Sequence, residues 1–162
     1  MNILFLTVVK IISLEDGGIF PDLLAKLREE GHMVYIMSPT ERRDKLKTHT
    51  IKEQNTQILK VKTFNIQKAN LFEKGIATLA IEYQYLKALK SNFLNVKFDL
   101  VLYSTPPITF SKVIEFVRKR DGAYSYLLLK DIFPQNAVDM GMLKKGGFLH
   151  KLFLKKEKKL YE

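Results

Sequence analysis

The sequence alternates short apolar stretches, typical of buried strands, with amphipathic stretches typical of helices. The first apolar stretch, Asn2–Val9, is continuous and rich in β-branched residues, as expected for a strand covered on both faces. A helix is expected over Ile19–Glu30, with Leu23, Leu24 and Leu27 on its apolar face. This order predicts an α/β domain, with a Rossmann-like, mostly parallel sheet and helices on both faces.

The rest of the chain continues the same alternation. Further strands are expected over His32–Ser38, Gln57–Phe64, Phe98–Pro107 and Ala123–Asp131, the second of them nearer an edge. Helices are expected over Gly75–Leu94, within 108–122 around an inner face of Ile114 and Val117, and in the basic segment at the end of the sequence. Apolar positions spaced by three or four predict the buried face of the long helix: Ile76, Leu79, Ala80, Tyr83, Leu86 and Leu89. The polar stretch 41–55 is expected to be a loop or a frayed helix.

Composition limits the classes of protein that this chain can belong to. Its 162 residues fit a single domain, 1–162. The sequence has no cysteine, which excludes disulfides, thiolate nucleophiles and zinc–thiolate sites and favours a cytoplasmic location. No apolar run approaches the ~20 residues of a membrane-spanning helix. We expect no cofactor.

Three scattered histidines complete the set of metal-ligand candidates. His32 is expected to be structural, and His49 and His150 lie in basic stretches that we expect to be exposed. Because no two of them have the spacing of metal ligands, we predict no metal site.

The formal net charge of +10 has two interpretations. Such a surplus attracts polyanions, which include nucleic acid, anionic lipid and phosphorylated small molecules. It can equally be a lysine-rich, solvated surface. The basic residues are dispersed and no nucleic-acid-binding motif is present, so we expect no nucleic-acid partner and rank a nucleic-acid-binding module last among the alternatives.

Two loops that leave predicted strands carry candidate binding residues. Gly17 and Gly18 precede the first helix, where backbone can approach a ligand and helix N–H groups can meet an anion. Ser104 and Thr105 precede two prolines and offer two hydroxyls. Each pattern also fits an ordinary turn, and no dinucleotide or Walker fingerprint is present.

A third loop groups chemically distinct side chains directly behind the last predicted strand. Lys130, Asp131, Phe133 and Gln135 bring together a cation, a carboxylate, an aromatic ring and an amide. Asp131 can instead cap the short helix that follows, and Phe133 can belong to the core. Ligands of open parallel sheets bind beyond the carboxyl ends of the strands, so we expect the three loops to meet in one crevice that accepts an anionic ligand.

These stretches together resemble the N-terminal domain of bacterial glycosyltransferases with the GT-B fold, of the family 4 type that builds capsular and other surface polysaccharides. The resemblance covers nearly the whole chain, and four stretches carry it: Gly17-Gly18, Leu23–Ser38 with its Gly31-His32 pair, Asp99–Pro107, and Asp131–Gln135 followed by Gly141-Met142-Leu143. Many relatives have Arg, Trp and Glu where this chain has Lys130, Phe133 and Gln135.

The resemblance implies two Rossmann-like domains that face each other across a cleft. The N-terminal domain binds a saccharide acceptor, often linked to a lipid diphosphate, and the C-terminal domain binds the nucleotide-sugar donor. The expected roles follow from it: Asp131 is the catalytic group at the acceptor hydroxyl, whereas the substrate-binding set is Gly17, Gly18, Ser104, Thr105, Lys130, Phe133 and Gln135. The donor-binding domain is absent from these 162 residues, so we expect the chain alone to be inactive or nearly so.

Two alternatives stay open at this point. The chain can be the acceptor-binding subunit of a glycosyltransferase split over two polypeptides, which we rank second.

The basic end, with seven lysines and two glutamates from Lys144 to Glu162, can pack on the sheet with its lysines in water, which we favour. It can also lie on an anionic bilayer at the inner face of the membrane, because a basic amphipathic helix suits that surface.

Overall fold

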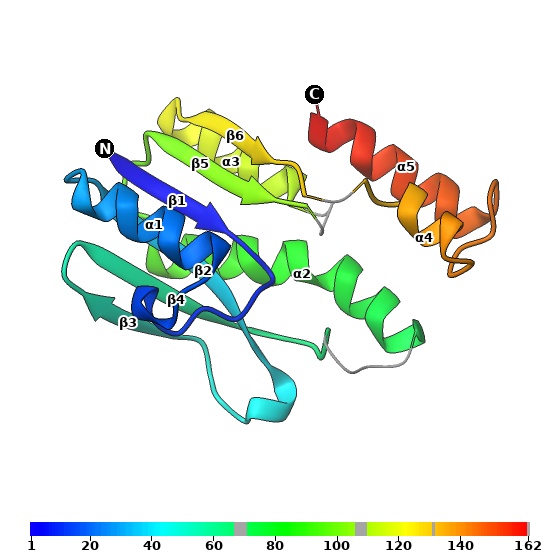
Figure 1. Cartoon of the computed structure of the whole chain (residues 1–162), viewed down its shortest axis with the longest axis horizontal. Coiled ribbons are helices and arrows are strands. Elements are labelled where there is room, and N and C mark those ends of the chain that lie inside the picture. Colours follow the sequence, from blue (N-terminus) through cyan, green and yellow to red (C-terminus); the bar gives the residue numbers. More distant parts are fainter. Residues whose placement is uncertain (67–70, 106–109, 131, 162) are drawn as a thin grey trace.

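The structure is a computed structural model that describes residues 1–66, 71–105, 110–130 and 132–161. The strands are β1 (Asn2–Leu6), β2 (Met33–Glu41), β3 (His49–Glu53), β4 (Thr56–Thr63), β5 (Leu100–Ser104) and β6 (Tyr124–Leu128). The helices are α1 (Ile19–Glu29), α2 (Leu71–Asn92), α3 (Ser111–Asp121), α4 (Gln135–Asp139) and α5 (Phe148–Tyr161), with short 3-10 turns η1 (Leu14–Asp16) and η2 (Arg42–Asp44). The strands form a six-stranded sheet in the order β3-β4-β2-β1-β5-β6 (Figure 1).

The winding of the sheet reverses direction at its centre. The chain runs outward from β1 through β2 to β4, and then returns to place β5 on the other side of β1. Neighbouring strands are parallel except for β3, which pairs antiparallel with β4. This arrangement confirms the predicted α/β, Rossmann-like fold. The reversal lies between β1 and β5, and in such sheets ligands bind beyond the carboxyl ends of the strands at that point.

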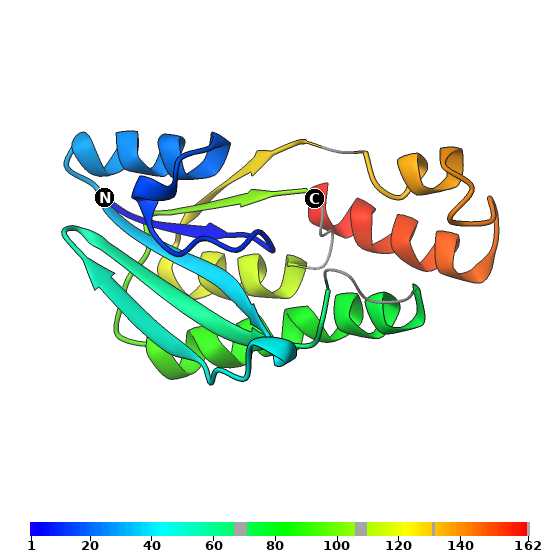
Figure 2. The same ribbon diagram turned by 60° about the horizontal axis from the view of Figure 1, so that its bottom comes forward.

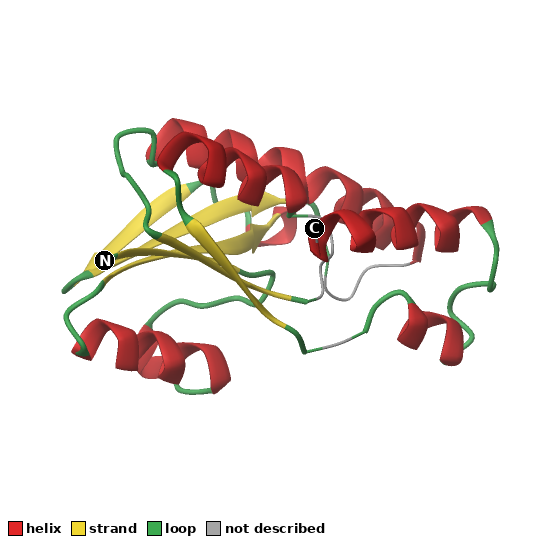
Figure 3. Ribbon diagram, turned by 90° about the horizontal axis from the view of Figure 1, so that it is seen from above, coloured by secondary structure: helices red, strands yellow, loops and turns green. Residues whose placement is uncertain are grey.

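Alternating side chains of the central strand divide the core into two layers. Leu4 and Leu6 of β1 belong to the cluster under α2 and α3, whereas Ile3 and Phe5 belong to the cluster under α1. Figure 3 views these layers, with α1 on one face of the sheet and α2 and α3 on the other. The helix predicted within 108–122 is α3, and its expected inner residues Ile114 and Val117 are buried.

The polar stretch 41–55 contains a strand, so the expectation of a loop or frayed helix is wrong. β3 lies at the sheet edge, where its residues are exposed or half-buried and an apolar pattern is not needed. A tight turn joins it to β4 with Asn55 in the left-handed region (φ 52°), a conformation that asparagine tolerates. β4 therefore has a neighbour on each side and is the second strand from this edge, which agrees with its expected position nearer an edge.

The long helix α2 buries only part of the face that its apolar spacing predicted: Leu89 is buried and Leu86 packs against the core cluster. Ile76, Leu79 and Tyr83 are between 45% and 69% exposed. The buried apolar residues among those described in α2 are Ala77, Ile81, Tyr85, Ala88 and Leu89. Apolar residues occur nearly all round this helix, so their spacing did not define one stripe.

The last described strand, β6, lies at the edge of the sheet. Tyr124 is 79% exposed and Tyr126 59%, and Leu127 and Leu128 are only half-buried. β6 pairs with β5 on one side, and on its other side it has no neighbouring strand among the described residues.

The basic C-terminal segment forms α5, which packs through one side only. Phe153 and Leu160 are buried in the cluster under α3, whereas Phe148 is 81% exposed. His150 is also buried, contrary to the expectation of an exposed histidine, because its ring Nδ1 accepts the Gly146 N–H (3.2 Å) and closes the turn before α5. None of the helices in the described part of the chain has the length and apolar character needed to cross a bilayer.

Candidate functional site

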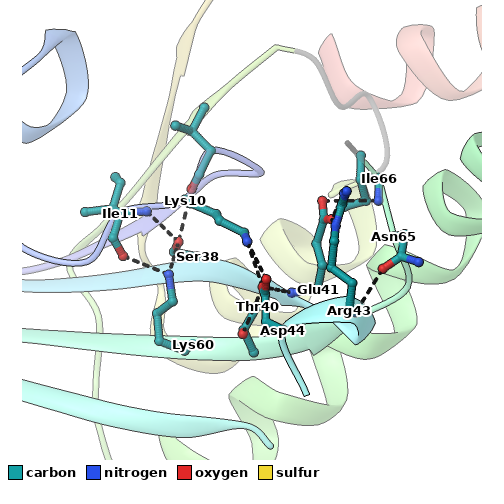
Figure 4. A network of polar contacts seen from close by, with 11 residues as sticks. Lys10, Ile11, Ser38, Thr40, Glu41, Arg43, Asp44, Lys60, Asn65 and Ile66 are labelled. Atoms are coloured by element: carbon teal, nitrogen blue, oxygen red, sulfur yellow. Dashed lines mark hydrogen bonds and ion pairs between the residues drawn. The ribbon is translucent and has the colours of Figure 1, made fainter. Parts of the chain in front are cut away.

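The loop after β1 is attached to the sheet through its own backbone. Ser38 of β2 bridges two points of this loop, since its hydroxyl donates to the Val9 carbonyl (3.0 Å) and accepts the Ile11 N–H (2.9 Å) (Figure 4). Lys60 of β4 adds a third contact by donating from its Nζ to the Ile11 carbonyl (2.9 Å). The path of the loop is therefore fixed by side chains from two neighbouring strands.

Lys60 makes these contacts from inside the protein. The residue is 6% exposed, and its Nζ also donates to the Ser38 hydroxyl (3.0 Å). Burial, together with the positive charge of Lys10, lowers the pKa of Lys60 to about 8. The buried amine therefore links β4 to the loop after β1.

A second attachment joins the same loop to η2. Lys10 Nζ contacts both carboxylate oxygens of Asp44, at 2.7 and 2.9 Å. Asp44 also accepts the Glu41 N–H (2.8 Å), so its carboxylate is already held in place. The hydrogen bond from Lys10 lowers the pKa of Asp44 below its ordinary value.

Behind this attachment, a buried carboxylate organises the carboxyl ends of β2 and β4. Glu41 is 1% exposed; one of its oxygens pairs with the guanidinium of Arg43 and the other accepts the Ile66 N–H (3.2 Å). Arg43 donates its backbone N–H to the Asn65 side chain (3.1 Å). Figure 4 shows this group beside the Lys10–Asp44 pair, at the same end of the sheet.

The loop after β1 ends in two glycines that directly precede α1. η1 is closed by a reciprocal pair of bonds between Ser13 and Asp16. Gly17 (φ 70°) and Gly18 (φ 114°, ψ 170°) follow in conformations that residues with a Cβ rarely adopt. Gly18 donates its N–H to the Asp22 side chain (3.2 Å). The first-turn N–H groups of Ile19 and Phe20 have no acceptor within the helix.

The two glycines line a cavity of about 230 Å³ at the carboxyl end of the sheet. Residues of the β1 loop and the first turn of α1 form most of its wall, and Lys130 closes it from the far side of β5. The lining residues are Val9, Lys10, Ile11, Asp16, Gly17, Gly18, Ile19, Phe20, Pro21 and Lys130. Gly17, Gly18 and Lys130, predicted from separate loops, thus meet at one place.

Lys130 approaches this cavity over an aromatic ring. Its Nζ lies 5.8 Å from the centre of the Phe20 ring, within the range of a cation–π contact. Its backbone N–H donates to the Thr105 hydroxyl (3.2 Å), which ties the tip of β6 to the tip of β5. The position of the lysine is therefore supported from both β5 and α1.

Ser104 and Thr105 do not line the cavity that the structure describes around the glycines. Both are buried, at 3% and 1% exposure. Thr105 contributes indirectly, because its hydroxyl holds the Lys130 backbone and its N–H donates to the Leu128 carbonyl (3.4 Å).

The remaining predicted residues lie elsewhere or outside the described residues. The Phe133 ring packs edge-on against Phe153 of α5 (5.1 Å between centres), as a core residue would. Gln135 is exposed and donates to the Asp139 side chain (2.7 Å) within α4. Asp131, the expected catalytic group, lies outside the described residues.

Two larger hollows lie along α3 and β6. They measure about 510 and 700 Å³ and share Glu115, Arg118 and Ser125 in their walls. Neither is lined by a described residue of the predicted site. The smaller cavity remains the one at which sequence prediction and geometry coincide.

Several residues that shape the site were not predicted from the sequence. Lys10, Ser38, Asp44 and Lys60 each carry an ordinary surface-type side chain in an unremarkable context. One signal could have revealed Lys60: it lies two positions after Ile58 in a strand, which places it on the face that the strand buries.

The arrangement is suited to holding a small anion rather than a metal. Two lysines and the N-terminal end of α1 surround the cavity, and each favours negative charge. Among the described residues that line it, Asp16 is the one carboxylate. Within the described ranges, no group of three or more His, Asp or Glu is placed to hold a metal ion.

Comparison with known proteins adds no further assignment: the sequence matches no family model, and a search of curated proteins found no match.

Proposed function

We propose that this chain is the acceptor-binding domain of a GT-B glycosyltransferase that transfers a sugar from a nucleotide sugar to a saccharide acceptor in surface polysaccharide synthesis. A second domain would hold the donor, and the reaction would take place between the two. The acceptor would be linked to a lipid diphosphate, and the protein would work in the cytoplasm at the inner face of the membrane.

One observation supports this proposal more than the others. Gly17, Gly18 and Lys130 line a single cavity at the carboxyl end of the sheet, beside the point where its winding reverses. The resemblance described above assigns substrate contacts to these same three residues. A cavity walled by lysines and a helix N-terminus suits the phosphate charge of such substrates.

In the proposed reaction, each part of the site has a distinct task. The glycine turn and Lys130 would hold the charge of the leaving nucleoside diphosphate. That charge develops as the bond from the anomeric carbon of the sugar to the phosphate oxygen breaks and the acceptor oxygen bonds to the same carbon. Asp131, next to Lys130 in the sequence, would accept the proton of the attacking hydroxyl. The attachments of the β1 loop through Ser38 and Lys60 would keep the glycine turn in position.

A binding experiment on this chain tests the anion site. Inorganic pyrophosphate is added to the ¹⁵N-labelled protein, and we expect shifts of the amide resonances of residues 17–20 and of Lys130. Lys130→Ala should weaken binding by about 10-fold or more, as expected for losing a hydrogen bond to a charged group.

Lys119→Ala is the matched control, because it removes the same charge from α3, where Lys119 pairs with Glu115 (2.8 Å). Its pyrophosphate affinity should stay within twofold of the wild type. Equal losses in the two variants, or unchanged resonances at residues 17–20, would contradict the proposed site.

Transfer itself is tested in an enzyme that contains both domains. Asp131→Asn should reduce turnover about 10²–10⁴-fold, which is typical of a positioned acid–base group. Turnover is measured with a polyprenyl-diphosphate-linked saccharide as acceptor. A variant that retains full turnover would remove Asp131 from the reaction.

A further inference from the structure

The structure presents exposed apolar side chains at one end of the molecule, between α4 and α5. Figures 1 and 2 show these helices projecting beyond the sheet, on the side where β5 and β6 end. Within ten residues of sequence, Met140 is 64% exposed, Met142 49%, Phe148 81% and Leu149 50%. We call the segment Met140–Leu149 the tip loop. Single exposed apolar residues are common, but four within ten residues of sequence are a local concentration of apolar surface, which is typical of a binding surface.

Basic residues accompany this apolar patch, and acidic residues are missing from it. Lys144 and Lys145 lie within the tip loop, and Lys151 and Lys155 follow on the exposed side of α5. The sequence has no aspartate or glutamate from Met140 to Lys156. A partner for this surface must therefore be both apolar and negatively charged.

Most of the N–H groups between Met140 and Gly147 find acceptors within α4 and the tip loop or at the start of α5. The N–H groups of Met142 and Leu143 both donate to the Ala137 carbonyl (2.8 and 3.1 Å), and Gly141 donates to Val138 (2.9 Å). Gly147 donates to Lys144 (3.0 Å), and Gly146 to the buried ring of His150 (3.2 Å). Each of these hydrogen bonds lowers the cost of moving the loop from water toward lipid, because apolar lipid excludes unpaired backbone groups.

The tip loop is also supported from beneath. Leu143 packs against the core cluster that lies under α3. The ring contact between Phe133 and Phe153 joins the segment after β6 to α5. The exposed side chains therefore project from a fixed base.

We propose that the tip loop is a membrane anchor, in which Phe148, Leu149, Met140 and Met142 enter the interface of an anionic bilayer while Lys144 and Lys145 contact lipid headgroups. An anionic bilayer offers both the apolar layer and the negative charge that this surface requires. A nucleic acid would meet the lysines and leave the apolar side chains in water.

The anchor would bring the candidate site to its substrate. The tip loop follows β6, whose carboxyl end carries Lys130 to the cavity, so anchor and cavity lie at the same end of the sheet. This link rests on the proposed function, because only a lipid-linked acceptor needs a cavity held close to the headgroups. The anchor itself depends only on the tip loop.

Vesicle sedimentation tests the anchor on the whole chain. Vesicles of phosphatidylcholine containing 30% phosphatidylglycerol are compared with pure phosphatidylcholine, at low and at high salt. We expect binding to the anionic vesicles that weakens with salt, as surface lysines predict. No binding at low salt would overturn the proposal.

Two variants separate the apolar contribution from the charged one. Phe148→Ser should reduce partitioning about tenfold, because a buried phenylalanine side chain is lost from the interface. Lys144→Ala combined with Lys145→Ala should reduce it about 30-fold, at ~1 kcal/mol for each lysine near the surface. If Phe148→Ser binds like the wild type, the insertion is wrong.

Tyr124→Ser is the matched control, since Tyr124 is an equally exposed aromatic residue at the opposite, amino end of β6. It should bind vesicles as the wild type does, and an equal loss in this variant would overturn the assignment to the tip loop. Circular dichroism and the pyrophosphate titration accompany each variant. Vesicle binding without pyrophosphate binding would contradict the proposed function and leave the anchor standing, and the reverse result would contradict the anchor alone.

Discussion

The pKa of the Lys60 amine differs between the folded and the unfolded chain. Burial lowers its pKa to about 8 in the folded protein, against 10.5 in the unfolded chain. Between these values the unfolded chain holds more protons than the folded one. The free energy of unfolding contributed by this group therefore increases as the pH rises from 8 to 10.5, and is lost again as the pH falls through 8.

A pair of denaturation curves tests this behaviour. The free energy of unfolding of the wild type is compared with that of Lys60→Met by urea denaturation at several pH values from 7 to 10.5. The wild type should gain stability relative to the variant over this range, because the variant has no amine to deprotonate. A constant difference between the two proteins would show that the buried amine keeps an ordinary pKa.

At the scale of residues, local chemistry in the sequence was sufficient to anticipate part of the geometry of the candidate site. Gly17, Gly18 and Lys130 were identified because glycines before a helix and a lysine after a strand are visible in sequence, and all three line one cavity. The contacts of Ser38 and Lys60 with the β1 loop join three separate segments. Only the sheet order brings those segments together, and sequence spacing does not contain it.

At the scale of elements, α2 illustrates what a periodic pattern can and cannot define. The existence of the helix was predicted correctly, but the sheet selected the face with small and aromatic residues. Ala77 permits close approach, and Tyr85 reaches through the core to donate its hydroxyl to the Thr7 carbonyl (2.6 Å). This hydrogen bond allows the tyrosine hydroxyl to be buried, and a hydropathy pattern does not predict such a bond.

Two tyrosines on α2 allow a direct test of which face is buried. Tyr85→Phe should lower the free energy of unfolding by about 1–3 kcal/mol, because the Thr7 carbonyl would be left buried without its donor. Tyr83→Phe is the control, since Tyr83 is 69% exposed and its change should stay within ~0.5 kcal/mol. Urea denaturation measures both, and equal effects would mean that the face is assigned wrongly.

The edge strands were harder to predict for opposite reasons. β3 is polar because one side of it faces solvent, so its sequence resembles a loop. β6 contains two tyrosines and two leucines in five residues, so its sequence resembles a buried strand although it has one neighbour. In both strands, the position in the sheet decides the exposure, and position follows from the topology of the whole chain.

At the scale of the molecule, the sheet predicts a gradient of hydrogen-exchange protection. β1 lies at the centre, with strands on both sides and helices on both faces. In β6, Tyr124 donates to Asp99 (2.9 Å) and Leu128 accepts from Thr105 (3.4 Å), so alternate residues bond to β5. The N–H groups of Ser125 and Leu127 then point away from the sheet.

Amide exchange followed by NMR tests this gradient. The amides of Leu4 and Phe5 should exchange only through global unfolding, and those of Ser125 and Leu127 much faster than that of Tyr126 between them. Slow exchange at Ser125 and Leu127 would mean that the outer edge of β6 is covered in solution.

The cavity takes its two walls from strands that do not touch. The glycine turn follows β1, Lys130 follows β6, and β5 separates them. An anion bound by both walls would link the end of β1 to the end of β6 across the intervening β5. Anion binding would therefore stabilise the edge strand β6, because local unfolding of β6 would require the anion to dissociate first.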